Sequence, residues 1–92
     1  MFVLSAKLTF YIAHGTSLKD KRRVRQSIIE KTRRKFNAAI AEIDTQDILQ
    51  TLTIGVAVVS ADAAHRQSYL RAVIRFMEEQ AEAELMSADF DH

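Results

Sequence analysis

Residues 2–13 alternate between apolar and polar side chains. The even positions are all apolar, namely Phe2, Leu4, Ala6, Leu8, Phe10 and Ile12. The odd positions include polar ones, namely Ser5, Lys7, Thr9 and Tyr11. A period of two is typical of a strand that buries one face, so this segment is predicted to be the first strand.

A helical period begins after the predicted turn at His14, Gly15 and Thr16. Ser17 is a suitable N-cap, and Asp20 stands where a capping box usually has Glu or Gln. At 100° per residue one stripe collects the apolar side, namely Leu18, Val24, Ile28, Ile29, Thr32 and Phe36. The opposite face collects Lys19, Arg23, Arg33 and Arg34, so the pattern predicts an amphipathic helix whose solvent side is basic.

Two more strands are predicted in the middle of the chain. Residues 37–44 indicate a short strand in which either Ile40 or Ile43 faces inward, followed by a polar turn over 44–47. Alternation returns over residues 48–60, with one side formed by Ile48, Leu52, Ile54, Val56 and Val58. This segment is rich in β-branched residues, which favours a central strand.

The last third of the chain predicts a helix and an edge strand. Asp62 is the expected N-cap of a helix that ends near Gln80. Its broad apolar face holds Ala63, Tyr69, Leu70, Val73, Ile74, Phe76 and Met77. Residues 81–90 are acidic and weakly alternating, which suits an edge strand because charge there discourages aggregation.

The order strand, helix, strand, strand, helix, strand is that of an α+β, ferredoxin-like βαββαβ sandwich. Right-handed crossovers place the first and third strands in the centre of a four-stranded antiparallel sheet and both helices on one face. We expect a single domain over residues 1–92, because a chain of this length buries one modest core. That core is expected to join Leu8, Phe10, Ile54 and Val56 to Ile28, Phe36, Leu70 and Val73.

The amino-acid composition excludes several classes of protein. With 48% hydrophobic and 27% charged residues the chain has the composition of a globular domain. It has no cysteine, which excludes disulfides, thiolate nucleophiles and cysteine-based metal sites. No apolar run approaches the roughly 18 residues needed to cross a bilayer, so we expect a cytoplasmic protein without membrane contact.

The charges are strongly segregated. Nine of the thirteen Lys and Arg residues lie between Lys19 and Lys35 with two acids, a balance of 9 − 2 = +7, whereas the remainder holds 4 bases and 10 acids, or −6. A concentrated cationic surface attracts phosphate polymers. The predicted RNA or phosphate contacts are Lys19, Lys21, Arg22, Arg23, Arg25, Arg33 and Arg34. The alternative is a solvated face with local pairs, such as Glu30 with Arg33 and Arg34.

Lys21 and Arg25 differ from the other cations in this helix. Both project by angle into the apolar stripe, so each must either extend past the end of the sheet or converge on a partner. Base stacking is not expected, because the outward residues of the third strand are Thr51, Thr53, Gly55, Ala57 and Val59. Phosphate contacts would therefore hold a structured RNA by its shape.

Little in the sequence points to catalysis. His14, His65 and His92 show no metal-ligand spacing, and no glycine-rich phosphate loop or His-Glu-x-x-His motif is present. An acylphosphatase would need a glycine-framed phosphate loop ending in Arg, and the corresponding turn is His14-Gly15-Thr16-Ser17. We therefore expect no catalytic residues, no cofactor and no metal.

Several segments together resemble a known family. They are Ser17-Leu18-Lys19-Asp20-Lys21-Arg22-Arg23-Val24, Arg34-Lys35-Phe36-Asn37, Ala41-Glu42-Ile43-Asp44, Gln46-Asp47 and Ile54-Gly55-Val56-Ala57-Val58-Val59-Ser60. The chain is similar in these segments to the YlxP-like family of small bacterial proteins, domain of unknown function 503. The resemblance implies a ferredoxin-like fold and a role near ribosomes or RNA, without an established activity. Arg25 and the pair Ile48-Leu49 depart from it, where an apolar residue and an aromatic residue are usual.

Two partner hypotheses remain. The first is RNA or a ribosomal particle bound by the basic helix. The second is a protein partner, including a homodimer through the open side of the sheet, where Val3, Thr9, Tyr11, Thr53, Ala57 and Val59 form a surface more apolar than a solvent face needs. The salt dependence of binding distinguishes the two hypotheses, because affinity for phosphates falls steeply as the salt concentration rises and affinity at an apolar interface does not.

Overall fold

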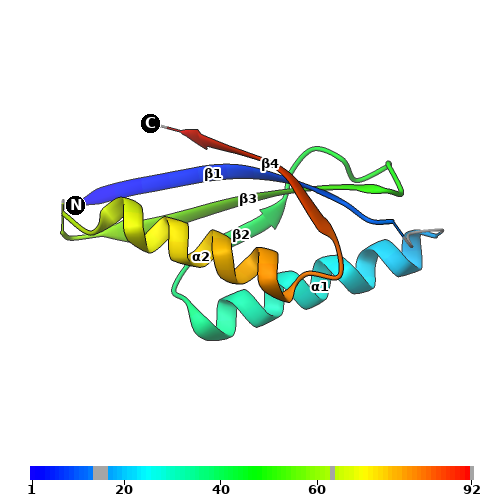
Figure 1. The fold of residues 1–92 in the computed structure, drawn as a ribbon, viewed down its shortest axis with the longest axis horizontal. Helices are drawn as coiled ribbons and strands as arrows, with labels where there is room; N and C mark the ends of the chain where they lie inside the picture. Colours follow the sequence, from blue (N-terminus) through cyan, green and yellow to red (C-terminus); the bar gives the residue numbers. More distant parts are fainter. Residues whose placement is uncertain (14–16, 63, 92) are drawn as a thin grey trace.

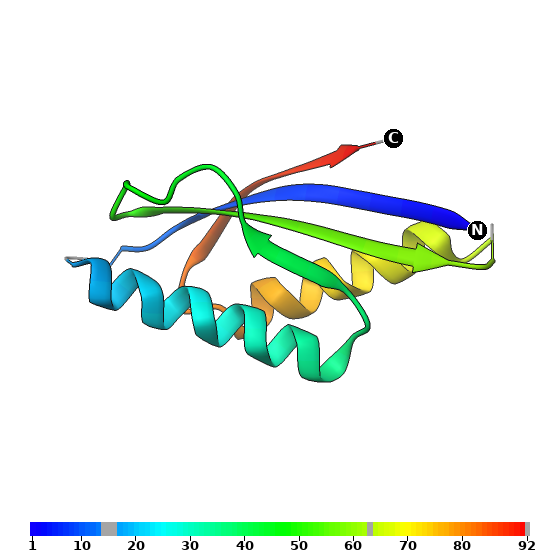
Figure 2. The same ribbon diagram turned by 180° about the vertical axis from the view of Figure 1, so that it is seen from behind.

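The alternating segments of the chain form one antiparallel sheet in the order β2-β3-β1-β4. The computed structural model describes residues 1–13, 17–62 and 64–91, so the expected turn at residues 14–16 and Ala63 lie outside it. The strands are β1 Phe2–Tyr11, β2 Ala39–Glu42, β3 Thr51–Ser60 and β4 Glu84–Asp91. The helices are α1 Leu18–Lys35 and α2 Arg66–Gln80, and both cover the same face of the sheet (Figures 1 and 2). This confirms the predicted ferredoxin-like βαββαβ arrangement with β1 and β3 in the centre.

The core lies between the sheet and the two helices. Leu8 and Phe10 of β1 and Ile54 of β3 are fully buried, and they pack with Ile28 of α1 and Val73 of α2. Phe36 is half-buried at the margin of this cluster, where its ring meets those of Tyr69 and Phe76 edge to face. The period of two in β1 and β3 therefore selected the correct inward side chains.

The two helices begin in different ways. The Ser17 hydroxyl accepts a hydrogen bond from the Asp20 backbone N–H at 3.1 Å, which confirms the predicted N-cap of α1. The prediction that Asp62 caps α2 was wrong, because the N-cap is His65 and makes no side-chain capping bond. The Asp62 carboxylate instead accepts from the Ala64 N–H at 2.8 Å, so it closes a local turn before the helix starts.

The structure settles the register of β2. Ile40 pairs with Val56 and is 4% exposed, whereas Ile43 is 41% exposed on the opposite side. The expected strand over 48–60 begins only at Thr51, and Ile48 is 53% exposed. Ile48 was thus wrongly predicted to face the core, because residues 43–50 form a loop that is fastened to α1.

A substitution at Ile54 tests which face of β3 is buried. Ile54→Ala leaves a cavity in a fully buried site, so it should lower the free energy of unfolding by roughly 2 to 5 kcal/mol, measured by urea denaturation. Ile48→Ala, the same change at a position that is 53% exposed, is the control and should change stability by no more than about 0.5 kcal/mol. A loss below about 0.5 kcal/mol for Ile54→Ala would mean that the assigned face of β3 is incorrect.

Candidate nucleic-acid interface

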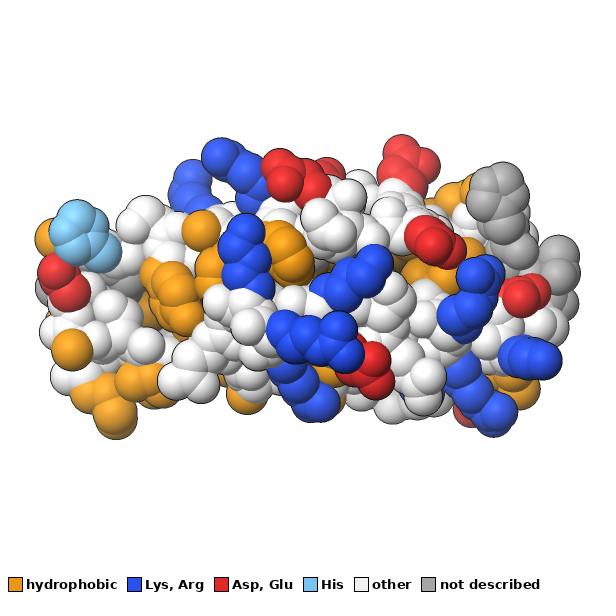
Figure 3. All heavy atoms as spheres, turned by 90° about the horizontal axis from the view of Figure 1, so that it is seen from below, with side chains coloured by type: hydrophobic (Ala, Val, Ile, Leu, Met, Phe, Trp, Pro, Cys, Tyr) orange, Lys and Arg blue, Asp and Glu red, His pale blue; other side chains and the backbone are white. Residues whose placement is uncertain are grey.

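The side of α1 that faces away from the sheet is covered by cations. The buried side of the helix consists of Lys21, Val24, Ile28 and Thr32. Figure 3 shows Lys and Arg side chains gathered along the helical face of the molecule, over α1. We call the following exposed cations the basic face of α1: Lys19, Arg22, Arg23, Lys31, Arg33 and Arg34.

Lys21 and Arg25 do not point outward with the others, because they converge on Glu42 at the end of β2. The Arg25 guanidinium donates to Glu42 Oε1 at 3.0 Å. The Lys21 Nζ lies 3.0 Å from Glu42 Oε2, an ion-pair contact whose angles do not suit a hydrogen bond. The Lys21 and Glu42 side chains are 3% and 6% exposed, so this ion pair is almost completely desolvated.

The Lys21 ammonium also holds the loop over residues 43–50. It donates to the backbone carbonyls of Thr45 and of Ile48, the latter at 2.6 Å. The ammonium group therefore has two hydrogen-bond acceptors and one ion-pair partner, Glu42. Lys21 is therefore withdrawn from the set of predicted phosphate contacts, because its charge is buried and fully engaged inside the protein. Arg25, with 29% of its side chain exposed, remains at the surface in part.

The remaining cations have few partners. The Arg33 guanidinium donates to the Ile40 carbonyl at 2.8 Å, at the outer edge of β2. Arg23 lies 3.8 Å from Glu82, but both side chains are more than two-thirds exposed, so this pair contributes little stability. Within residues 17–62 and 64–91, no ion pair involves Lys19, Arg22, Lys31 or Arg34. The local pairing expected of Glu30 with Arg33 and Arg34 is also absent from these residues, so most of the positive charge faces solvent.

A hollow of about 380 Å³ runs between α1 and the edge of β2. Arg25 and Arg33 line it from two turns of α1, and its polar wall also holds the amides of Gln26 and Gln46 and the carboxylates of Glu30 and Glu42. Guanidinium and amide groups are suited to phosphate oxygens. The sequence had indicated the two arginines but neither amide, because Gln46 reaches this place only through the path of the loop.

Among the described residues there is no group of three or more His, Asp or Glu side chains that could hold a metal ion. His65 lies 3.7 Å from Asp62 in an exposed pair. The other two histidines, His14 and His92, lie outside the described residues. No helix in the described part of the chain is long and apolar enough to cross a membrane.

Lys21 can be tested by a neutral replacement of similar length. Lys21→Met leaves the Glu42 carboxylate buried with Arg25 alone, so it should lower the free energy of unfolding by roughly 3 to 5 kcal/mol. Lys21→Met combined with Glu42→Gln should recover part of this loss, because the unpaired charge is gone. Denaturant unfolding measures both.

Arg34→Met is the matched control for the Lys21 replacement, since it removes a cation from the same helix on the solvent side. It should shift stability by no more than about 0.5 kcal/mol. Similar losses for the two single variants would contradict the structural role assigned to Lys21.

Comparison with known proteins supplies a family. The sequence profile of the family described as "Protein of unknown function (DUF503)" matches residues 3–90. The chain is 37% identical over 68 residues to the "Uncharacterized protein YlxP" of Bacillus subtilis (strain 168), and the match covers 74% of each chain. Neither description states an activity, a substrate or a partner.

Proposed function

This chain belongs to the DUF503 family, and we propose that it is a non-catalytic module that binds structured RNA or a ribosomal particle through the basic face of α1. One observation carries the proposal: all six cations of the basic face are exposed, and among the described residues only Arg23 of these six has an acidic partner. Such a surface raises the local concentration of anions, and phosphate polymers bring many anionic charges at once.

The length of α1 suits contacts with several phosphates. Its 18 residues span about 27 Å. Lys19 and Arg22 lie in the first turns, and Arg33 and Arg34 in the last turn. Because these groups are fixed on one rigid element, they can engage phosphates along a folded RNA at the same time.

The sheet favours recognition of shape over recognition of bases. The exposed or half-buried outward residues of β3 are Thr51, Gly55, Ala57 and Val59, none of which is aromatic. RNA-binding sheets that read bases stack them on aromatic side chains. This supports contact with the phosphate backbone of structured RNA, such as ribosomal RNA, in which register and shape decide the fit.

A double substitution on the basic face should separate affinity from stability. Arg23→Ala with Arg34→Ala should weaken binding to ribosomal RNA while changing the free energy of unfolding by about 0.5 kcal/mol or less per site. Losing two phosphate contacts should also reduce the slope of log affinity against log salt by roughly 1.4 to 1.8. Filter binding or fluorescence anisotropy over a salt series measures both.

The matched control removes the same number of arginines from α2, as Arg71→Ala with Arg75→Ala, two exposed positions. It should leave RNA affinity nearly unchanged. Equal losses from the two pairs would indicate diffuse attraction without a defined interface. Failure of the unmodified protein to bind ribosomal RNA or to sediment with ribosomal particles would refute the proposal.

A further inference from the structure

In the described part of the chain, no helix or strand lies over the face of the sheet opposite the helices (Figures 1 and 2). An antiparallel sheet that faces water normally presents polar side chains there. Here Val3 is 64% exposed, Val59 is 59% exposed and Tyr11 is 40% exposed. Val3 and Val59 are register partners across β1 and β3, so they form an apolar pair at one end of this open face.

Residues 43–45 cover the other part of this face. The Ile43 side chain lies on Gly55, where a Cβ would come within 3.2 Å of Ile43 Cγ2, and Asp44 lies 3.7 Å from the Lys7 ammonium. The Thr45 hydroxyl lies 3.2 Å from that of Thr53, which is 4% exposed. Thr53 therefore does not belong to the exposed patch that its position in the strand predicts.

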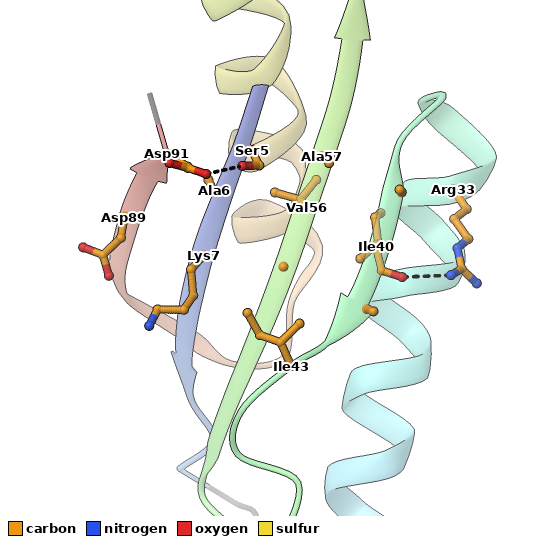
Figure 4. Close-up of a pocket in the computed structure, with 13 residues that line it drawn as sticks. Ser5, Ala6, Lys7, Arg33, Ile40, Ile43, Val56, Ala57, Asp89 and Asp91 are labelled. Atoms are coloured by element: carbon orange, nitrogen blue, oxygen red, sulfur yellow. Dashed lines mark hydrogen bonds between the residues drawn. The ribbon is translucent and has the colours of Figure 1, made fainter. Parts of the chain in front are cut away.

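A shallow trough of about 550 Å³ remains beside Ile43 (Figure 4). Its floor crosses all four strands in two levels. One level consists of Ala41, Gly55, Lys7 and Asp89, and the next consists of Ala39, Ala57, Ser5 and Asp91. Each level thus has an alanine on β2 at one side and an aspartate on β4 at the other.

Arg33 adds a positive charge beyond the alanine side. Its guanidinium lies at the edge of β2, bound to the Ile40 carbonyl, and it lines the trough from there. Figure 4 shows Asp89 and Asp91 at one side of the open face and Arg33 at the other. The face is therefore acidic along β4, carries the Lys7–Asp44 pair on β1, is neutral along β3 and β2, and is basic at the outer edge of β2.

We propose that a second copy of this chain occupies the open face, packed sheet to sheet about a two-fold axis parallel to the strands. This axis reverses the strand order, so β4 of each copy lies over β2 of the other. Asp89 and Asp91 of one copy then face the small Ala41 and Ala39 of its partner and lie toward Arg33. An axis across the strands would place β4 over β4 and bring the aspartates together, which like-charge repulsion opposes.

The pair covers the apolar side chains that the open face exposes. In this arrangement the Val3 side chain of one copy lies over Val59 of the other, which covers both exposed valines. Sheets that pack in this aligned way are about 10 Å apart, with their inner side chains interdigitated.

The proposed pair leaves most of the basic face of α1 free. Both helical layers lie on the outside of the pair, so the cations of this face other than Arg33 stay uncovered in each copy. RNA affinity and the state of association can therefore be separated on variants that keep Arg33, such as Asp89→Arg and Val59→Asp.

Analytical ultracentrifugation of the full chain tests the proposal. The unmodified protein should form a dimer, and Arg33→Glu or Asp89→Arg alone should raise its dissociation constant by at least about tenfold, since each places like charges opposite one another. The double variant should restore the dimer, because the exchanged charges again attract. Val59→Asp, at an exposed position, should also dissociate the pair without unfolding the chain.

Arg34→Glu is the control, since it makes the same charge change one residue further along α1, on the solvent side. It should leave the dissociation constant unchanged. Equal weakening by Arg34→Glu, a double variant as weak as the single ones, or a protein that stays monomeric at high concentration would each overturn the proposal. Assemblies that grow beyond the dimer would contradict the two-fold axis.

Discussion

The buried ammonium of Lys21 is the interaction on which the arrangement of the middle of the chain depends. A charge taken out of water is strongly unfavourable unless it is paired and hydrogen-bonded. Lys21 meets this requirement with Glu42 and with the carbonyls of Thr45 and Ile48, residues that follow one another from the end of β2 through the loop. Another path of this loop would take the Thr45 and Ile48 carbonyls away from the buried ammonium, so the two hydrogen bonds hold the loop against α1.

The position of the loop then shapes the open face of the sheet. Because residues 43–45 turn back over β3, they cover Thr53 and pack against one side of Gly55, while the trough over the two levels of Lys7 and Ser5 stays open. Gly55 suits this place, because a Cβ there would lie 3.2 Å from Ile43 Cγ2 and would push that side chain outward. Ile43 lines the trough, so the loop that Lys21 holds forms one side of it.

The molecule keeps two kinds of surface apart. The exposed cations are concentrated on α1, whereas β4 and the chain before it carry acids such as Glu84, Asp89 and Asp91. The sheet lies between them, with β4 at one edge and α1 beneath β2 near the other. A nearly neutral chain can in this way attract phosphates with one face while its other face has a different partner, since the field at a surface depends on nearby charges.

The order of the six elements, the buried sides of β1, β3 and α1 and the N-cap at Ser17 could all be predicted from the sequence. These features depend on periodicity and on contacts a few residues apart, which neighbouring side chains decide. The location of the basic face followed for the same reason, because helical geometry alone places Lys19, Arg23 and Arg34 together.

Only the tertiary structure decided which cations remain outside. Lys21 and Arg25 have the same charge as their neighbours, and their partners lie 17 to 27 positions further along the chain. The choice between Ile40 and Ile43, the late start of β3 and the cover over Thr53 depend on the same long-range contacts. A local pattern records which side of an element is apolar, but whether a charged or polar side chain is buried depends on the distant groups that the fold brings to it.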